Sequence, residues 1–433
     1  MKALTKPLPG KNVSSTVRLK YGTWLWALAF AIVPVERLFN SLIWSWASTV
    51  LVLVLLVANV LIGRRARPFG RAVWIFSFVA ILLAGVVSGT HSHMSSSIFV
   101  GVLLALELLL APFVLTFYVR ENPRFIRIVV TAFLVSQTLS ALVGILQKGG
   151  LSVLGQSQRG GRINGLSTHP NVLGVFAALV LILVVYLVLT KHARAISAVL
   201  LVGIPNAVAL IMTGSLSSLL TFGAGVLVLM ISLRGQTLLA IPFVILAGGI
   251  GLGLAALAGV NVSFVTELIE ERISAVTGQT SGSSLGSAEV RDRTYEFARQ
   301  YLAGDPWIGV GLDGTNAGTY NGLTVVHNFV LRSWYQGGIL MLAFAIVIIL
   351  LVIRVVILGF RRPEFALQSA ILVSIAVYGA TSALFNQNQY WLPILLCFAT
   401  LPGAVSKPEN ARPSGQASKE PPLALPVSRT HRK

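Results

Sequence analysis

Apolar and polar residues are segregated along this chain on the scale of whole helices. Runs of about 20 apolar residues recur from Tyr21 to Pro402, and each is long enough to cross a bilayer as an α-helix. The pattern predicts an all-α, polytopic integral membrane protein with about 12 transmembrane helices. We expect them at 21–36, 42–63, 72–90, 98–119, 128–147, 171–190, 195–212, 215–233, 237–259, 327–353, 366–385 and 391–403.

One long polar segment, residues 260–326, interrupts the apolar runs and carries eight of the 14 acidic residues. Residues 263–276 place their apolar side chains on one helical face, with most of the glutamates opposite. A second amphipathic helix is expected from Ser287 to Gly304, where Gly-Asp-Pro ends it. Its apolar stripe consists of Val290, Thr294, Phe297 and Tyr301. The segment is therefore predicted to be one folded helical loop rather than a linker.

Charge gives the orientation of these elements. The net charge is +19, but the chain is only 11% charged and 55% hydrophobic, whereas soluble domains carry about 25% charge. The excess of Lys and Arg lies in the short segments on one side of the predicted spans, which is the positive-inside bias of cytoplasmic segments. This distribution excludes a nucleic-acid partner and predicts a lipid-bilayer protein of the cytoplasmic (inner) membrane with both termini cytoplasmic.

The expected organisation has five parts. They are a cytoplasmic N-terminal segment (1–20), helices 1–9 (21–259), the extracytoplasmic loop (260–326), helices 10–12 (327–403) and a disordered basic cytoplasmic tail (404–433). The single cysteine, Cys397, excludes an intrachain disulfide and a cysteine-based metal site. His91 and His93 have no carboxylate near them in sequence, so we expect no metal site.

Gly309-Val310-Gly311-Leu312-Asp313-Gly314 matches the G-x-G-x-x-G pattern of dinucleotide-binding loops. That function requires a preceding strand and a following helix. Here the motif follows Pro306-Trp307 and continues into turn residues, which favours a tight turn, and no cofactor is expected.

Candidate chemistry lies where the loop ends. His327 opens an apolar helix, and an imidazole is the side chain whose ordinary pKa suits proton transfer near neutral pH. Asn328 and Arg332 are four residues apart and share the adjacent helical face. In another outer loop, Arg159 and Arg162 lie in a Gly-rich stretch, where they are either interfacial anchors or an anion clamp, since guanidinium groups bind phosphate oxygens.

Two further polar residues have alternative interpretations. His169 precedes Pro170 at a helix start, and we favour a structural role for it. Glu107 lies in the middle of a predicted span, where a carboxyl is costly unless it is neutral, paired or facing a cavity. It is either a proton-relay group or a hydrogen-bonded contact between helices, and we favour the contact.

Three motifs occur in a fixed order. Arg162 to Gly174 has an Arg/Gly stretch followed by Pro-Asn-x-x-Gly at the entry to a span, and Arg293 to Gly311 has a helix followed by DP-x-x-G-x-G. His327 to Ile339 reads His-Asn-x-x-Leu and then Gly-Gly-Ile. Together they resemble the O-antigen ligase / O-antigen polymerase superfamily of bacterial membrane glycan transferases. The resemblance covers roughly residues 130–390.

The resemblance implies a GT-C-like fold and a metal-independent membrane glycosyltransferase. It implies transfer from a polyprenyl-diphosphate-linked glycan donor to a hydroxyl of a lipid or glycan acceptor, at the outer face of the membrane. His327 would activate the acceptor, and Asn328 would orient His327. Arg162 would bind the diphosphate, supported by Arg159 or Arg332. The alternatives are a polymerase that uses a second lipid-linked glycan, and a proton-coupled membrane transporter.

One departure from the family pattern concerns the anion site. The family usually has an Arg in a Ser-Arg-Gly-like element, where this chain reads Ser215-Leu216-Ser217. A leucine cannot bind phosphate. Either Arg159 or Arg332 supplies that charge, or the activity or the donor differs.

Overall fold

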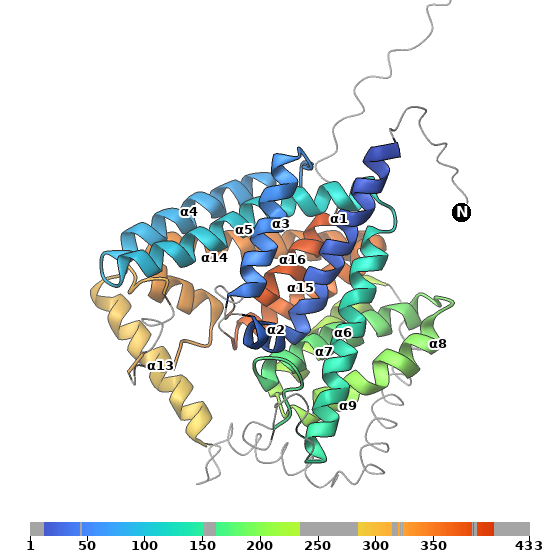
Figure 1. The fold of residues 1–433 in the computed structure, drawn as a ribbon. Helices are drawn as coiled ribbons and strands as arrows, with labels where there is room; N and C mark the ends of the chain where they lie inside the picture. Colours follow the sequence, from blue (N-terminus) through green and yellow to red (C-terminus); the bar gives the residue numbers. More distant parts are fainter. Residues whose placement is uncertain are drawn as a thin grey trace, which may run out of the picture.

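The computed structural model describes residues 13–43, 46–150, 152, 162–233, 285–313, 319–320, 322, 324–382, 384 and 388–401. All regular elements in these ranges are helices (Figure 1). They are α1 (Val13–Ile32), η1 (Val33–Val35), α2 (Glu36–Leu42), α3 (Ala47–Leu61), α4 (Arg71–Gly89), α5 (Met94–Glu121), α6 (Phe125–Lys148), α7 (Pro170–Leu189), α8 (Ala195–Ala198), η2 (Val199–Gly203), α9 (Ile204–Met212), α10 (Leu216–Ser232), α13 (Leu285–Gly304), α14 (Phe329–Arg361), η4 (Pro363–Phe365), α15 (Ala366–Gly379) and α16 (Asn388–Ala399).

Seven segments within the described ranges are long and apolar enough to span a membrane. They are Tyr21–Leu42, Arg71–Gly89, Met94–Glu121, Phe125–Lys148, Pro170–Leu189, Ala195–Met212 and Phe329–Arg361. Four shorter apolar helices are Ala47–Leu61, Leu216–Ser232, Pro363–Gly379 and Gln389–Ala399. Each coincides with an expected span, so the all-α, multi-span class is confirmed. The expected span 237–259 lies outside the described residues, and the number of twelve stays a prediction.

Several helices are longer than the hydropathy pattern predicts, and α5 and α14 are the longest of them. α5 has 28 residues and α14 has 33, so α5 alone extends about 42 Å at 1.5 Å per residue. A helix longer than the hydrocarbon layer fits by tilting. In Figure 1, α4 and α5 run side by side and lie obliquely to the upright α1 and α6. The apolar pattern ends at the charged residues, but the backbone hydrogen bonds continue beyond them.

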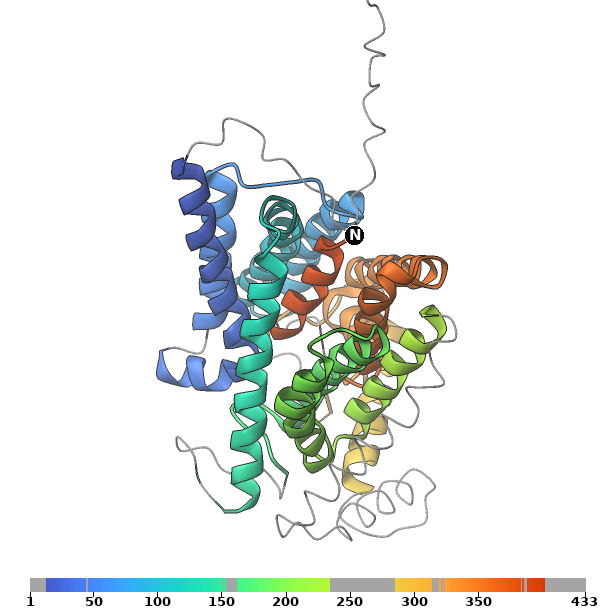
Figure 2. The ribbon, with the colours of Figure 1, turned by 90° about the vertical axis from the view of Figure 1, so that its right-hand side faces the viewer.

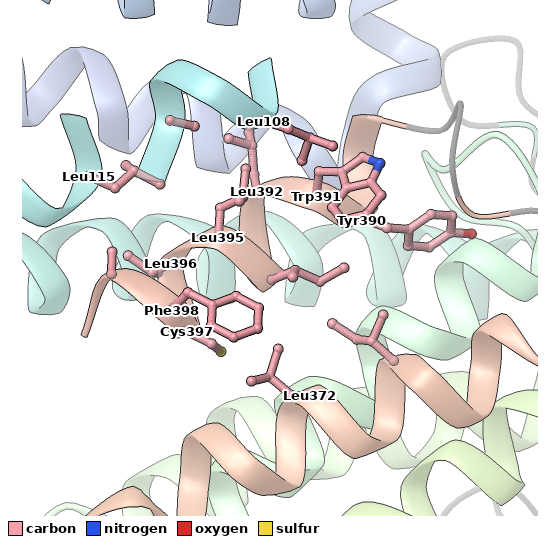
Figure 3. Close-up of a cluster of buried hydrophobic side chains, with 14 of the residues drawn as sticks. Leu108, Leu115, Leu372, Tyr390, Trp391, Leu392, Leu395, Leu396, Cys397 and Phe398 are labelled. Atoms are coloured by element: carbon pink, nitrogen blue, oxygen red, sulfur yellow. The ribbon is translucent and has the colours of Figure 1, made fainter. Parts of the chain in front are cut away.

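Packing places the shortest of the four shorter apolar helices at the centre. α16 contacts α5 and α15, and its residues Tyr390, Trp391, Leu395 and Phe398 are all at most 2% exposed. Figure 3 shows these side chains between Leu108 of α5 and the helix α15. α7 is apolar all round and largely buried, as expected for a helix with no solvent face. In Figure 2, α7 and α10 lie together beside α15. The ends of these central helices carry the candidate site.

Candidate functional site

The polar helix α13 docks on the first turns of α14 through an aromatic cluster. The ring of Tyr335 meets the rings of Tyr301 and Phe297 edge-on, with centroids 5.5 and 6.4 Å apart. Ala298 is fully buried in the same cluster. The apolar stripe expected on the second loop helix thus rests on the transmembrane bundle. The first expected loop helix, 263–276, lies outside the described residues.

The segment that follows α13 runs along α14 instead of forming a nucleotide loop. Asp305 Oδ1 accepts hydrogen bonds from the backbone N–H groups of Trp307 and Ile308, both at 3.1 Å. The N–H groups of Val310 and Gly311 then donate to the carbonyls of Tyr335 (3.0 Å) and Gln336 (2.9 Å). These bonds attach the loop directly to the helix that follows His327.

Glycine makes this close approach possible. α14 is interrupted at Gly338, which has φ 62° and ψ −157°, a conformation that is essentially restricted to glycine. A Cβ on Gly338 would overlap the backbone of Trp307, and one on Gly309 would overlap the backbone of Gln336. The Gly residues of both motifs therefore meet each other's segments in space, which explains why the two motifs occur together.

His327 is oriented by its own loop. Its Nδ1 lies 2.8 Å from the carbonyl oxygen of Val325. A carbonyl oxygen can only accept, so Nδ1 carries the proton and Nε2 of the neutral ring carries the lone pair. The hydroxyl of Tyr295 on α13 donates to the His327 carbonyl at 2.9 Å. The imidazole is thereby fixed in the tautomer that leaves Nε2 as the basic atom.

The surroundings of His327 favour its neutral form. Burial lowers the pKa of the imidazole from 6.5, the positive charges of Arg291 and Arg332 lower it further, and the hydrogen bond to Val325 opposes these effects. Burial also raises the pKa of Tyr295, so its hydroxyl remains a donor. The sequence interpretation missed Arg291. A signal was present, because Arg291 and Tyr295 are four apart on one helical face.

Asn328 caps α14. Its Oδ1 accepts from the Leu331 N–H at 2.9 Å, and its Nδ2 donates to the Ala380 carbonyl at 3.2 Å. Asn328 therefore holds the beginning of α14 to the end of α15. The expected role of Asn328 in orienting His327 stays a prediction.

Arg332 is 3% exposed and donates from Nε to Gln336 Oε1 at 2.7 Å. Gln336 Nε2 in turn donates to the carbonyls of Gly311 and Asp313, both at 3.2 Å. The guanidinium is thus bound to a glutamine that is itself held by the segment following α13.

Arg162 lies beside the N-terminus of α7. Its Nε donates to the Thr213 carbonyl at 2.6 Å and its Nη2 donates to Asn171 Oδ1 at 2.7 Å. His169 Nδ1 accepts from the Asn171 N–H at 3.1 Å and caps α7, so the structural role that we favoured for it is confirmed. Arg159 lies outside the described residues.

Arg162 is bound close to Leu216, the position at which the sequence resemblance implies an arginine. Leu216 is the first residue of α10, and its side chain is 44% exposed. The carbonyl that Arg162 binds belongs to Thr213, three residues earlier. Arg162 therefore places a positive charge beside the segment that contains Leu216.

Tyr378, at the end of α15, connects the two halves of the site. The charges of Arg162 and Arg291 both act on its hydroxyl, which lies 3.0 Å from the hydroxyl of Tyr390. Tyr378 lies two residues before Ala380, to which Asn328 is bound. The charge of Arg291 thus acts on both Tyr378 and His327. That of Arg162 acts on Tyr378, and that of Arg332 acts on His327.

Metal-ligating side chains do not cluster in the described ranges, where no three His, Cys, Asp or Glu residues could hold an ion together. His91 does have a carboxylate neighbour in space, because its Nδ1 lies 4.0 Å from Asp305 Oδ2. Comparison of the chain with models of known protein families and with curated proteins found no match.

Proposed function

We propose that this protein transfers a glycan from a polyprenyl-diphosphate donor to a hydroxyl acceptor at the outer face of the cytoplasmic membrane, as O-antigen ligases do. The observation that carries the proposal is the fixed tautomer of His327, on which the charges of Arg291 and Arg332 act. The charges of Arg162 and Arg291 both act on Tyr378. A neutral imidazole with Nε2 as acceptor is suited to general base catalysis. Guanidinium groups are suited to a diphosphate leaving group.

The proposed reaction is a single displacement. The acceptor hydroxyl gives its proton to Nε2 of His327 while its oxygen forms a bond to the anomeric carbon of the donor sugar. The bond from that carbon to the diphosphate oxygen breaks, and the polyprenyl diphosphate leaves with the electron pair. The charges of Arg162, Arg291 and Arg332 stabilise the negative charge that develops on the leaving group. The same charges favour loss of the proton from the imidazolium after transfer.

α13 supplies a polar surface for the sugar. An open hollow of about 510 Å³ borders this helix and is lined by Asp292, Tyr295, Glu296, Arg299, Gln300 and Ala303. Hydroxyl-rich ligands need several hydrogen-bonding groups, which these side chains offer. Tyr295 links this surface to His327 through the bond to the His327 carbonyl. The loop helix would therefore guide a glycan toward the base.

The test uses purified full-length protein, a polyprenyl-diphosphate-linked glycan and candidate acceptors. The products are separated on a gel. A single shifted acceptor band together with released polyprenyl diphosphate is the expected result. A ladder of glycan lengths would assign the polymerase alternative. No transfer to a lipid or glycan acceptor, by protein that is folded and retains donor binding, would overturn the proposal.

A further inference from the structure

A second polar feature lies among the membrane helices. A cavity with about 20 Å³ of room lies where α1, η1, α2, α3, α5 and α16 meet. That room suffices for one water-sized ligand. Its polar lining consists of side chains that carry oxygen atoms, namely Glu36, Ser48, Thr49, Glu107 and Gln389.

The two carboxylates in this cavity differ in their surroundings. Glu36 accepts hydrogen bonds from Ser48 Oγ (3.0 Å) and Asn40 Nδ2 (3.4 Å), and such donors stabilise a carboxylate charge. Glu107 is 2% exposed, and its Oε1 is buried without a hydrogen-bond partner. The interhelical hydrogen bond that we favoured for Glu107 from the sequence is therefore wrong. Its carboxyl is oriented into a cavity instead.

Within the described part of the chain, no basic side chain neutralises the carboxylates of Glu36 and Glu107. Among the described residues, no Lys, Arg or His nitrogen lies within 4.0 Å of either carboxylate. α3 has no titratable residue, α4 has only Arg71 at its first position, and α16 has Tyr390 and Cys397. The remaining charged residue of α2 is Arg37, and those of α1 are Arg18 and Lys20 in its first half.

Electrostatics disfavour two uncompensated negative charges in this cavity. The charge of Glu36 acts on Glu107, and two carboxylates that share an apolar site cannot both remain ionised without a counter-charge. Burial disfavours a charge on either carboxyl, but the hydrogen bonds from Ser48 and Asn40 oppose that cost on Glu36, so a single negative charge is better stabilised there than on Glu107. A second negative charge would have to be compensated by a ligand of the size of one water molecule. Hard cations prefer the oxygen atoms that line this cavity.

We propose that Glu36 and Glu107 hold one small monovalent cation between them, either a proton or Na⁺, inside the helix bundle. The site is built from helices outside the proposed transferase site, and it stands whether or not the transferase proposal holds. A proton would form a carboxylic acid at Glu107, and Na⁺ would be bound by the oxygen atoms of the pair.

Dicyclohexylcarbodiimide tests this site in the purified wild-type protein. The reagent is apolar and adds to protonated carboxyls: the acid proton goes to a carbodiimide nitrogen, the carboxylate oxygen bonds to the central carbon, and rearrangement leaves a stable N-acylurea. Peptide mass spectrometry locates the adduct without any substitution. We expect labelling at Glu107. Parallel samples contain NaCl or choline chloride at equal ionic strength, over a range of pH.

The two sources of the cation give different results. Suppression of labelling by NaCl but not by choline chloride identifies Na⁺. Labelling that is lost only as the pH rises, equally in both salts, identifies the proton. Glu107→Gln should abolish the adduct at this peptide, and Glu36→Gln should abolish protection by Na⁺. Glu121→Gln, at the exposed end of the same helix, is the matched control and should leave labelling unchanged. Absence of label at Glu107 in every condition, together with no binding of radioactive sodium, would overturn the proposal.

Discussion

His327 donates a hydrogen bond from Nδ1 to the backbone carbonyl of Val325, two residues earlier, at 2.8 Å. The bond is local, so the loop fixes the imidazole tautomer before any substrate binds. Pre-organisation of this kind reduces the cost of reaching the reactive geometry. It also determines which nitrogen can take a proton.

The rate of transfer should depend on pH through His327. In the proposed mechanism the neutral imidazole is the active form, and burial together with the charge of Arg291 lowers its pKa below 6.5. Activity should therefore be level at neutral pH and fall only as the pH drops through that lowered pKa. Arg291→Gln removes one cause of the shift, so the acid limb should move to higher pH, toward 6.5. Initial rates across the acid range measure this.

Two variants make the pH experiment specific. Arg291→Lys keeps the positive charge and should leave the acid limb near its wild-type position. Arg293→Gln removes an exposed arginine from the same helix and should leave the profile unchanged. An acid limb that stays in place in Arg291→Gln would contradict the electrostatic role of Arg291.

Arg162→Ala should lower the transfer rate on the order of 100-fold or more, the usual effect of removing one group that stabilises transition-state charge. Arg162→Lys should be intermediate, because an ammonium keeps the charge but cannot reproduce both bonds, to Thr213 and Asn171. Initial rates and donor binding are measured for each variant. Arg127→Ala, at an exposed position of α6, is the control. Equal rates in the Arg162 and Arg127 variants would exclude Arg162 from the site.

Tyr295→Phe removes the hydroxyl that donates to the His327 carbonyl at 2.9 Å. A neutral hydrogen bond contributes about 1 kcal/mol, which corresponds to roughly a fivefold loss of rate if the bond serves to position His327. Tyr301→Phe loses a weaker bond to Ile308 at 3.4 Å and serves as the comparison. A loss of thermal stability without a loss of rate in Tyr295→Phe would show that the bond only supports the fold.

Gly338→Ala should destabilise the fold. A side chain at φ 62°, ψ −157° costs about 1–3 kcal/mol in backbone strain, and its Cβ would also overlap Trp307. The matched substitution Gly223→Ala lies within α10, where a Cβ meets nothing within 4 Å. It should be neutral or stabilising. Unfolding temperatures in detergent compare the two, and equal temperatures would mean that the contact between Trp307 and α14 does not matter.

The helices were predictable from the sequence because an apolar run of bilayer length has few other structures. Their ends were less predictable. α14 continues to Arg361, beyond the expected end at 353, because charged residues on its last turns do not break backbone hydrogen bonds. Hydropathy reports where a helix is apolar, not where it stops.

The site was partly predictable. His327 and Arg162 stand out because they lie beside apolar runs on the predicted outer side, away from the basic segments of the predicted cytoplasmic side. Arg291 does not, because it lies on a helix with several exposed charges and acquires its neighbours only when α13 docks on α14. The cavity at Glu107 depends on contacts between helices far apart in sequence, which no local pattern contains.

The most direct measurement is chemical rescue of His327→Ala. Without added base, this variant should lose about 10²–10⁴-fold in transfer rate, the usual contribution of general base catalysis, while donor binding stays intact. Free imidazole should restore part of the rate. His93→Ala, at an exposed histidine, should match the wild type and should not respond to imidazole. Transfer by His327→Ala at the wild-type rate, at equal protein level, would contradict the role of His327 as the base.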